Sequence, residues 1–339
     1  MAKPFAIGLT MTGAISAGTY TAGVLDFLLE ALDQWEAAKA GELPPDERGR
    51  VPWHDVVISV LSGASAGSIC AALLAASLGR GFSPADGRAS PPADQNRFYD
   101  VWVRNARIEG LLEPDDLSHA GVIRSLLNSD YLTRMARDAL TIAGPYAKPS
   151  YMADPFQILL TTANLRGVTY GIRFSGESPD DYEMVLHADA QHFYLSTSSD
   201  PNLDSRKVVR LDPRQSDDGW TVGLRDAALA SSAFPFGLSA RLLRRSSQYY
   251  RHLLWPIPMG AAPAPTPRPA AFRYATWYAE ERIPPLSPSG RAAERARHRQ
   301  RRARGLRRLP QRSLPAARLP IGPAELPALP GEAFRALLG

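Results

Sequence analysis

The chain is 339 residues long, 45% hydrophobic and 22% charged, a globular composition that excludes disorder of the whole chain. No apolar run approaches the ~18 residues that span a bilayer, and the single cysteine, Cys70, excludes an internal disulfide and a cysteine metal cluster. The net charge of +5 conceals two parts. Residues 1–260 have 24 basic and 29 acidic side chains, whereas residues 261–339 have 15 arginines, no lysine, 5 glutamates and no aspartate.

The first residues predict a strand, a small-residue loop and a helix. Residues 4–9 are a short apolar run, and a loop of small residues follows at 12–18. Apolar residues then recur at helical spacing over 24–35, and Gly41 ends the helix. The apolar stretch at 5–24 could instead be a secretory signal peptide, but four threonines and one serine interrupt the apolar core that such a signal needs.

The same pattern repeats further along the chain. Residues 56–61 form a β-branched apolar run, which is typical of a parallel strand covered on both faces. A turn of small residues follows at 62–67, and 69–78 is an apolar, alanine-rich helix. Two successive strand–loop–helix units predict an α/β fold.

The sequence after residue 78 predicts further helices and strands, and its composition changes near residue 256. We expect helices at 98–108, 122–127, 131–142 and 225–232, and strands at 156–161, 169–174 and 208–211. Thirteen of the 30 prolines fall in 261–339, which has no hydrophobic period. We therefore expect residues 1–255 to form one domain, incomplete at its C-terminal side, and residues 256–339 to form a disordered tail rich in Pro, Arg and Ala.

The segment 63–67 has the G-x-S-x-G pattern of a nucleophile elbow, between a predicted strand and a predicted helix. On that turn Ser65 is expected to adopt a strained backbone conformation that presents its hydroxyl above the sheet edge. Gly63 and Gly67 allow the strand and the helix to approach closely. The sequence therefore predicts a nucleophilic serine, with a plain small-residue turn as the alternative.

A nucleophilic serine needs N–H donors for the oxyanion and a base for its proton. The N–H of Ala66 and the loop 13–18 are the candidate donors, because loops at the carboxyl ends of parallel strands emerge on one edge. That loop lacks a following Lys-Ser/Thr, which argues against a phosphate-binding loop. A triad could use His187, His192 or His252, although none lies in a motif-like setting.

Three segments together resemble the patatin-like phospholipase family. Residues 19–25 are similar to the helix after its oxyanion loop, residues 63–67 to its nucleophile elbow, and residues 227–235 to its third recurrent segment. The resemblance implies a three-layer α/β fold with a mostly parallel central sheet flanked by helices. It also implies a serine–aspartate dyad that hydrolyses acyl esters of lipids without a metal or other cofactor.

Carried over residue by residue, the resemblance makes Ser65 the nucleophile. Gly13, Ala14 and Ile15 occupy the positions of the family's consecutive oxyanion glycines, and Gly18 closes that loop. The usual glycine run is thus reduced to its first residue. Because backbone N–H groups donate whatever the side chain, the replacements leave the donors in place and put only the loop geometry in doubt.

A second departure concerns the base. The family places its dyad aspartate in an Asp-Gly-Gly or Asp-Gly-Ala turn after the third segment, yet this chain has no aspartate after Asp226. Asp218 begins an Asp-Gly pair, but it precedes that segment. Residues 272–276 resemble the strand that delivers the aspartate. Codons for residues 277–282, read one base later, can encode Gly-Met-Leu-Lys-Asn-Glu, which resembles the family's segment after the aspartate turn. We therefore expect a frameshifted or truncated C-terminal part.

Two interpretations of function stay open. One is a serine lipid acyl hydrolase of the phospholipase A type that acts through Ser65. The other is an inactive member of the family, either a lipid-binding pseudoenzyme or a damaged gene product, so the sequence leaves enzymatic activity undecided. The expected partner is a lipid or acyl-ester substrate, with peripheral membrane contact. We expect no nucleic-acid partner, although an arginine-rich tail could bind one or an anionic membrane. We expect the protein in the cytoplasm or at the membrane periphery.

Overall fold

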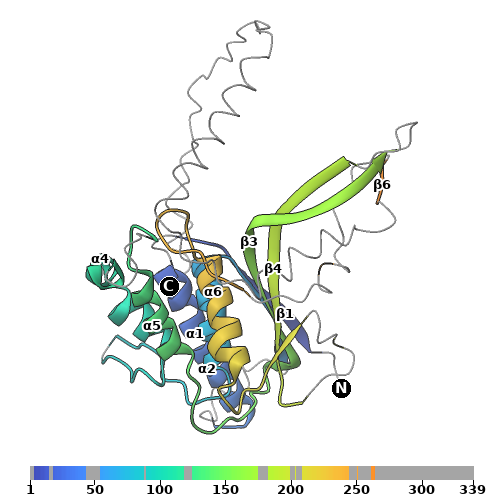
Figure 1. Ribbon diagram of the computed structural model, residues 1–339. Helices are drawn as coiled ribbons and strands as arrows, with labels where there is room; N and C mark the ends of the chain where they lie inside the picture. Colours follow the sequence, from blue (N-terminus) through green and yellow to red (C-terminus); the bar gives the residue numbers. More distant parts are fainter. Residues whose placement is uncertain are drawn as a thin grey trace, which may run out of the picture. The chain divides into compact units, whose positions relative to one another are not determined.

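The computed structural model (Figure 1) describes residues 4–14, 18–42, 54–87, 89–117, 124–174, 182–198, 203, 208–243, 250 and 261–263. The expected tail, apart from residues 261–263, lies outside these residues, as do the segment 272–276, Ile15 and His252. The predictions made for those segments therefore stay predictions.

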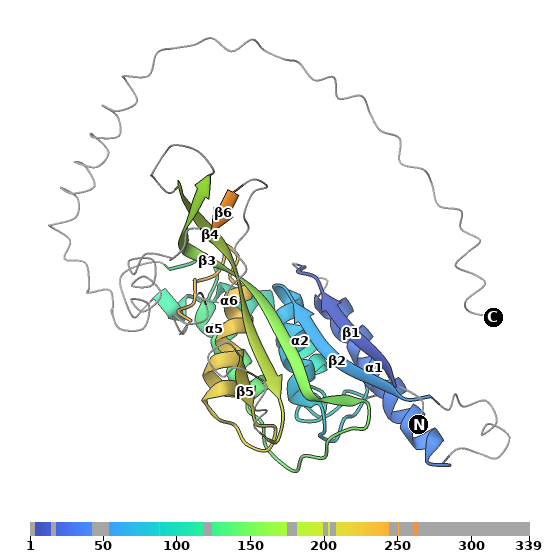
Figure 2. The same cartoon turned by 90° about the vertical axis from the view of Figure 1, so that its right-hand side faces the viewer.

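The fold is built on a mostly parallel sheet (Figure 2), with the strand order β1-β2-β3-β4-β5. Strands β1 (Phe5–Met11), β2 (Val56–Gly63) and β3 (Met152–Phe174) run parallel to one another. Strand β4 (Tyr182–Leu195) is antiparallel to β3, and β5 (Val209–Leu211) is parallel to β4. The short β6 (Ala261–Pro263) pairs with β3. The predicted α/β class with a mostly parallel central sheet is confirmed.

Helices α2 (Ala66–Ser77) and α6 (Arg225–Ser231) pack against the sheet, and α1 (Gly18–Lys39) and α5 (Ser129–Leu140) pack against α2 (Figure 1). Eleven of the twelve residues of α2 are buried, because this helix has protein on both sides. That position explains its composition of alanine, leucine and other small residues. The described chain has no helix that is both long and apolar enough to cross a bilayer.

The segment between α2 and α5 is less regular than expected. The predicted helix 98–108 is divided into α3 (Arg97–Tyr99) and a π-helix (Asp100–Asn105), and α4 (Ile108–Leu112) and a 3₁₀ turn (Pro114–Leu117) follow. The prediction of a helix over 122–127 is wrong for the part that is described. Residues 124–127 form no helix, with a bend at 126–127, and the N–H groups of Leu126 and Leu127 donate to the carbonyls of Phe236 and Gly237 instead.

The two strands predicted at 156–161 and 169–174 are one long strand, β3, which has an irregularity between Ala163 and Val168. Its partner strand β4 was not predicted from the sequence. A second π-helix (Gly219–Leu224) leads directly into α6. The core lies between the sheet and the helices, where Ile58, Leu61 and Phe156 are fully buried.

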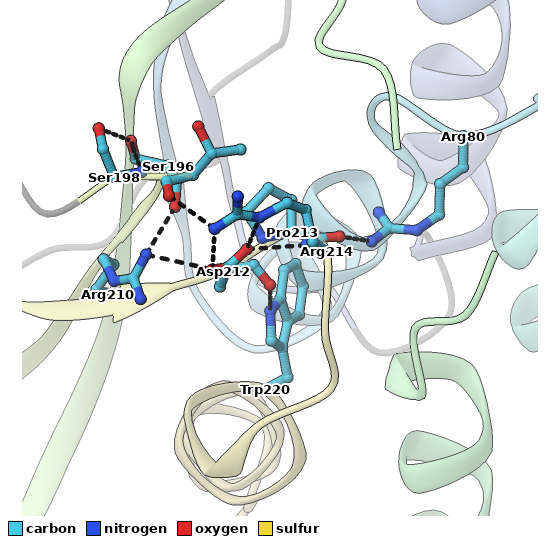
Figure 3. A network of polar contacts seen from close by, with 9 residues as sticks. Arg80, Ser196, Ser198, Arg210, Asp212, Pro213, Arg214 and Trp220 are labelled. Carbon is cyan, nitrogen blue, oxygen red and sulfur yellow. Dashed lines mark hydrogen bonds and ion pairs between the residues drawn. The ribbon is translucent and has the colours of Figure 1, made fainter. Parts of the chain in front are cut away.

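An ion-pair cluster fixes the end of β5 (Figure 3). The carboxylate of Asp212 is 4% exposed and accepts hydrogen bonds from the Arg214 side chain at 2.7 and 2.9 Å, with Arg210 at 3.4 Å. The hydrogen bond from Arg214 is the main cause that lowers the pKa of Asp212 to about 2. The indole N–H of Trp220 donates to the Asp212 carbonyl at 2.8 Å, and Arg80 donates to the carbonyl of Pro213. The cluster therefore ties β5 to the π-helix before α6 and to the end of α2.

Candidate active site

Ser65 occupies the turn between β2 and α2 in a backbone conformation that side chains rarely adopt. Its φ is 52° and its ψ is −120°. Such a conformation costs on the order of 1–3 kcal/mol and persists only where the surrounding structure enforces it. The residue is half-buried and begins a helix that is otherwise almost entirely buried. This is the strained geometry that the sequence analysis expected for a nucleophile elbow.

The two glycines of the motif are required by close backbone contacts. A Cβ at Gly63 would lie 2.5 Å from the carbonyl oxygen of Gly67. A Cβ at Gly67 would lie 2.3 Å from the carbonyl oxygen of Met11, at the end of β1. Both contacts are with backbone, which cannot move aside as a flexible side chain can. The nucleophile elbow is therefore tightly packed: Gly67 contacts the end of β1, and Gly63, at the end of β2, contacts Gly67.

The loop after β1 lies directly beside Ser65. A Cβ at Gly13 would lie 3.0 Å from the Cβ of Ser65 and 3.7 Å from its hydroxyl oxygen. Among the described residues, no hydrogen-bond partner is found for the N–H groups of Gly13, Ala14 and Ala66. By contrast, the N–H groups of the residues after Ala66 donate back to the turn. Of the residues predicted to form the oxyanion hole, the structure thus places Gly13 beside Ser65, next to the adjoining Ala66.

Gly18 has a packing explanation of its own. A Cβ at this position would lie 2.1 to 2.6 Å from ring atoms of Trp102, so the indole covers the start of α1. The carbonyl of Gly18 also lies 3.7 Å from the buried thiol of Cys70. Burial raises the pKa of that thiol to about 12, which keeps it protonated and unreactive. The proposed part of Gly18 in the oxyanion loop stays a prediction.

Ser231 makes a contact that the sequence analysis did not foresee. Its hydroxyl oxygen accepts hydrogen bonds from the N–H of Ser65 and from the hydroxyl of Ser68, both at 2.8 Å. Ser231 is the last residue of α6 and belongs to the third segment of the family resemblance. The segment therefore holds the elbow from the side of α6. The repeated small residues at 227–235 were the available signal, but they did not indicate which serine makes the contact.

Ser65 lines a pocket of about 650 Å³ at the carboxyl end of the sheet. Its walls come from the irregular part of β3, from β4 and from the chain on both sides of the end of α6. Most of its lining is apolar, with Val168, Phe234 and Leu243 as examples. A mostly apolar pocket beside a serine suits an acyl chain.

Asp189 is the one carboxylate among the described residues that line this pocket. It lies on β4 opposite Thr162, and two residues along the strand Gln191 is paired with Leu160. The hydroxyl of Tyr250 donates to Oδ2 of Asp189 at 2.8 Å, and the N–H of Ala190 donates to Oδ1 at 2.7 Å. The sequence analysis missed Asp189 because it had not predicted β4.

The other candidate bases lie elsewhere. Nδ1 of His187 donates to the carbonyl of Asn164 at 2.7 Å, and Nε2 of His192 is 2.7 Å from the side-chain oxygen of Gln157. Burial lowers the pKa of His192, which favours its neutral form. Neither histidine lines the pocket, nor does Asp218, which is exposed before the second π-helix.

Comparisons with known proteins agree with this geometry. A family model described as patatin-like phospholipase matches residues 9–252. A curated relative, the uncharacterized protein y4iI of Sinorhizobium fredii, is 35% identical over 282 residues. The match covers 75% of this chain but 39% of the relative, so the chain spans well under half the length of that protein. No solved structure gives a significant match.

Proposed function

The chain belongs to the patatin-like phospholipase family, and we propose that it is a serine lipid acyl hydrolase in which Ser65 is the nucleophile. One observation carries the proposal: a strained serine at the start of a buried helix meets the Gly13 loop at the wall of an apolar pocket. Strain of this kind concentrates at functional sites. The substrates are carboxylic esters of lipids, whose acyl chain would occupy the pocket.

In this mechanism the hydroxyl oxygen of Ser65 attacks the acyl carbonyl carbon while its proton passes to a base. The resulting oxyanion accepts hydrogen bonds from the N–H groups of Gly13, Ala14 and Ala66, and the N-terminus of α2 adds a favourable potential. Collapse of this intermediate expels the lipid alcohol, which takes up a proton, and leaves the acyl group on Ser65. Water then attacks this ester, releases the fatty acid and restores the hydroxyl.

We assign the base to Asp189. The dyad aspartate of the family is absent from its usual place in this chain, and a proton acceptor must reach Ser65 directly or through one water molecule. Asp189 shares the pocket with Ser65, and Tyr250 and Ala190 orient its carboxylate.

The test is hydrolysis of a soluble short-chain nitrophenyl ester by the full chain. We expect Asp189→Asn to lower kcat at least ~100-fold, the usual contribution of a general base, because an amide cannot take up the proton. Asp218→Asn is the matched control, since that carboxylate is exposed outside the pocket, and it should leave kcat unchanged. Equal kcat values for Asp189→Asn and the wild type would exclude Asp189 as the base.

A second candidate rests on the absence of aspartate after Asp226. In this alternative the chain is a catalytically inactive member of the family, with a C-terminal part that is frameshifted or truncated. A folded wild-type chain that hydrolyses no ester would favour it. Re-reading the gene across codons 270–285 in independent isolates would then test the cause, and an intact frame in all of them would count against a frameshift.

A further inference from the structure

The mouth of the pocket carries large apolar side chains that protein does not cover. Leu165, Phe234 and Leu242 line the pocket and are also 73%, 69% and 61% exposed, so they lie where it opens to solvent. Leu126 and Phe236 extend this group and are 79% and 86% exposed. Soluble proteins rarely gather so many exposed apolar side chains in one place unless the surface binds something. We call these five residues the apolar rim.

Hydrogen bonds hold the loop that carries Phe234 and Phe236. The carbonyl of Phe236 accepts the N–H of Leu126 at 2.9 Å, and the N–H of Leu238 donates to the carbonyl of Phe234 at 2.9 Å. Phe236 has a φ of 66°, which is rare and strained for a bulky residue. The fold thus holds the ring of Phe236 in solvent although its backbone conformation is strained. Because the ring is not buried in this chain, its burial does not offset that strain. Figure 1 shows this loop, which follows α6, beside the bend of β3.

Charge accompanies the apolar side chains. Exposed Arg124 lies two residues before Leu126, and exposed Arg166 follows Leu165 directly. The described residues 234–243, which carry three of the five rim side chains, contain no acidic residue. Apolar side chains next to basic ones are the combination that binds the surface of an anionic bilayer.

We propose that the apolar rim docks the pocket mouth onto an anionic lipid bilayer. The inference rests on the proposed function, because a lipid ester resides in the bilayer and must enter the pocket from there. With the rim inserted among the acyl chains, the substrate reaches Ser65 without crossing water. The occupant is the lipid surface itself, in preference to a second copy of the chain, because a bilayer supplies both the apolar interior and the negative charge.

The test uses the full chain with Ser65→Ala, so that binding is measured without hydrolysis. Sedimentation with vesicles of phosphatidylcholine, with or without phosphatidylglycerol, gives the partition coefficient. We expect binding to the anionic vesicles and a loss of at least ~10-fold in Leu126→Ser/Phe236→Ser, because each large apolar side chain contributes strongly to insertion. Neither substituted residue lines the pocket.

The matched control is Phe5→Ser/Phe27→Ser, which removes two exposed aromatic side chains outside the pocket. Phe5 begins β1, at the opposite end of that strand from the elbow. This control should bind vesicles as the parent does. Equal binding by the rim variant and the control would overturn the proposal. The proposal would also be overturned if the chain does not bind vesicles but forms a dimer, and Leu126→Ser/Phe236→Ser dissociates that dimer. The apolar rim would then join two copies of the chain.

Hydrolysis of the soluble ester by the chain with Ser65 intact keeps the two proposals separate. We expect Leu126→Ser/Phe236→Ser to cleave the soluble ester at the wild-type rate and to lose activity on vesicles. If the wild type cleaves no soluble ester, the proposed function fails, and the vesicle partition still decides whether the rim binds lipid.

Discussion

Among single residues, Gly67 has the least freedom in the site. A side chain there would meet the carbonyl of Met11 at the end of β1, and that backbone is held by its pairing with β2. The motif therefore needs glycine at this position because two backbones touch. Gly23 offers a contrast, since it lies on the exposed side of α1 with nothing within 4 Å of an added Cβ.

We predict opposite effects of alanine at these two glycines. Gly67→Ala should destabilise the protein by about 2 kcal/mol or more, since strand and helix must separate. Gly23→Ala should stabilise it by about 0.5–1 kcal/mol, since alanine loses less entropy in a helix. Urea unfolding of both variants measures the free energies. If Gly67→Ala is as stable as the wild type, the elbow does not pack against the end of β1 as closely as we infer.

Between elements, α6 supports the elbow through Ser231. The buried hydroxyl of Ser68 and the N–H of Ser65 both donate to it, so its removal leaves two donors unsatisfied. Ser231 does not take part in proton transfer in the proposed mechanism and acts by positioning Ser65. Its effect should therefore appear mainly in kcat.

Ser231→Ala should cost about 1–3 kcal/mol of stability and lower kcat while KM changes little, since unsatisfied buried donors are expensive. Ser231→Thr keeps the hydroxyl and should retain most of the wild-type stability and most of the wild-type kcat. Ser77→Ala is the matched control, because the Ser77 hydroxyl only bonds the Leu73 carbonyl within α2. Ester hydrolysis and thermal unfolding measure the effects. Wild-type kcat in Ser231→Ala would show that the contact does not position the nucleophile.

The elements around Ser65 could be predicted from sequence because their patterns are local. The β-branched run before Gly63 and the alanine-rich run after Gly67 each indicate a single kind of structure. Strand β4 could not be predicted in this way. Its sequence mixes charged, polar and helix-favouring residues, and its pairing with β3 decides its conformation. Asp189, which lies on β4, was missed for the same reason. The loop at Gly13 could be placed near Ser65 because it follows a well-marked strand, and its role towards an oxyanion stays a prediction.

At the scale of the whole molecule, the cluster around Asp212 joins parts of the chain that are far apart in sequence (Figure 3). It links the end of β5 to the end of α2 through Arg80 and to the approach of α6 through Trp220. The pocket lies between the sheet and the end of α6, so this cluster stabilises the frame that holds it. Because the pKa of Asp212 is lowered to about 2, its ionised form stabilises the fold above the ordinary pKa of an aspartate.

This stabilisation should be lost as the pH falls from about 5 to about 2, and we estimate it at about 2 kcal/mol. Asp212→Asn should remove it, lowering the free energy of unfolding at neutral pH and flattening its fall towards acid. Asp138→Asn is the control, since Asp138 and Arg137 form an exposed ion pair that should contribute little to the free energy of unfolding. Urea unfolding across this pH range measures both. An acid sensitivity in Asp212→Asn equal to that of the wild type would contradict the assignment.

The proposed mechanism requires the strained serine of this chain to be an activated nucleophile. The most direct measurement is covalent labelling of the purified full chain by a fluorophosphonate probe, with Ser65→Ala as the control. We predict that the wild type is labelled on Ser65 and that a folded Ser65→Ala protein is not labelled. A folded wild-type chain that the probe leaves unmodified, or equal labelling of the two proteins, would contradict it.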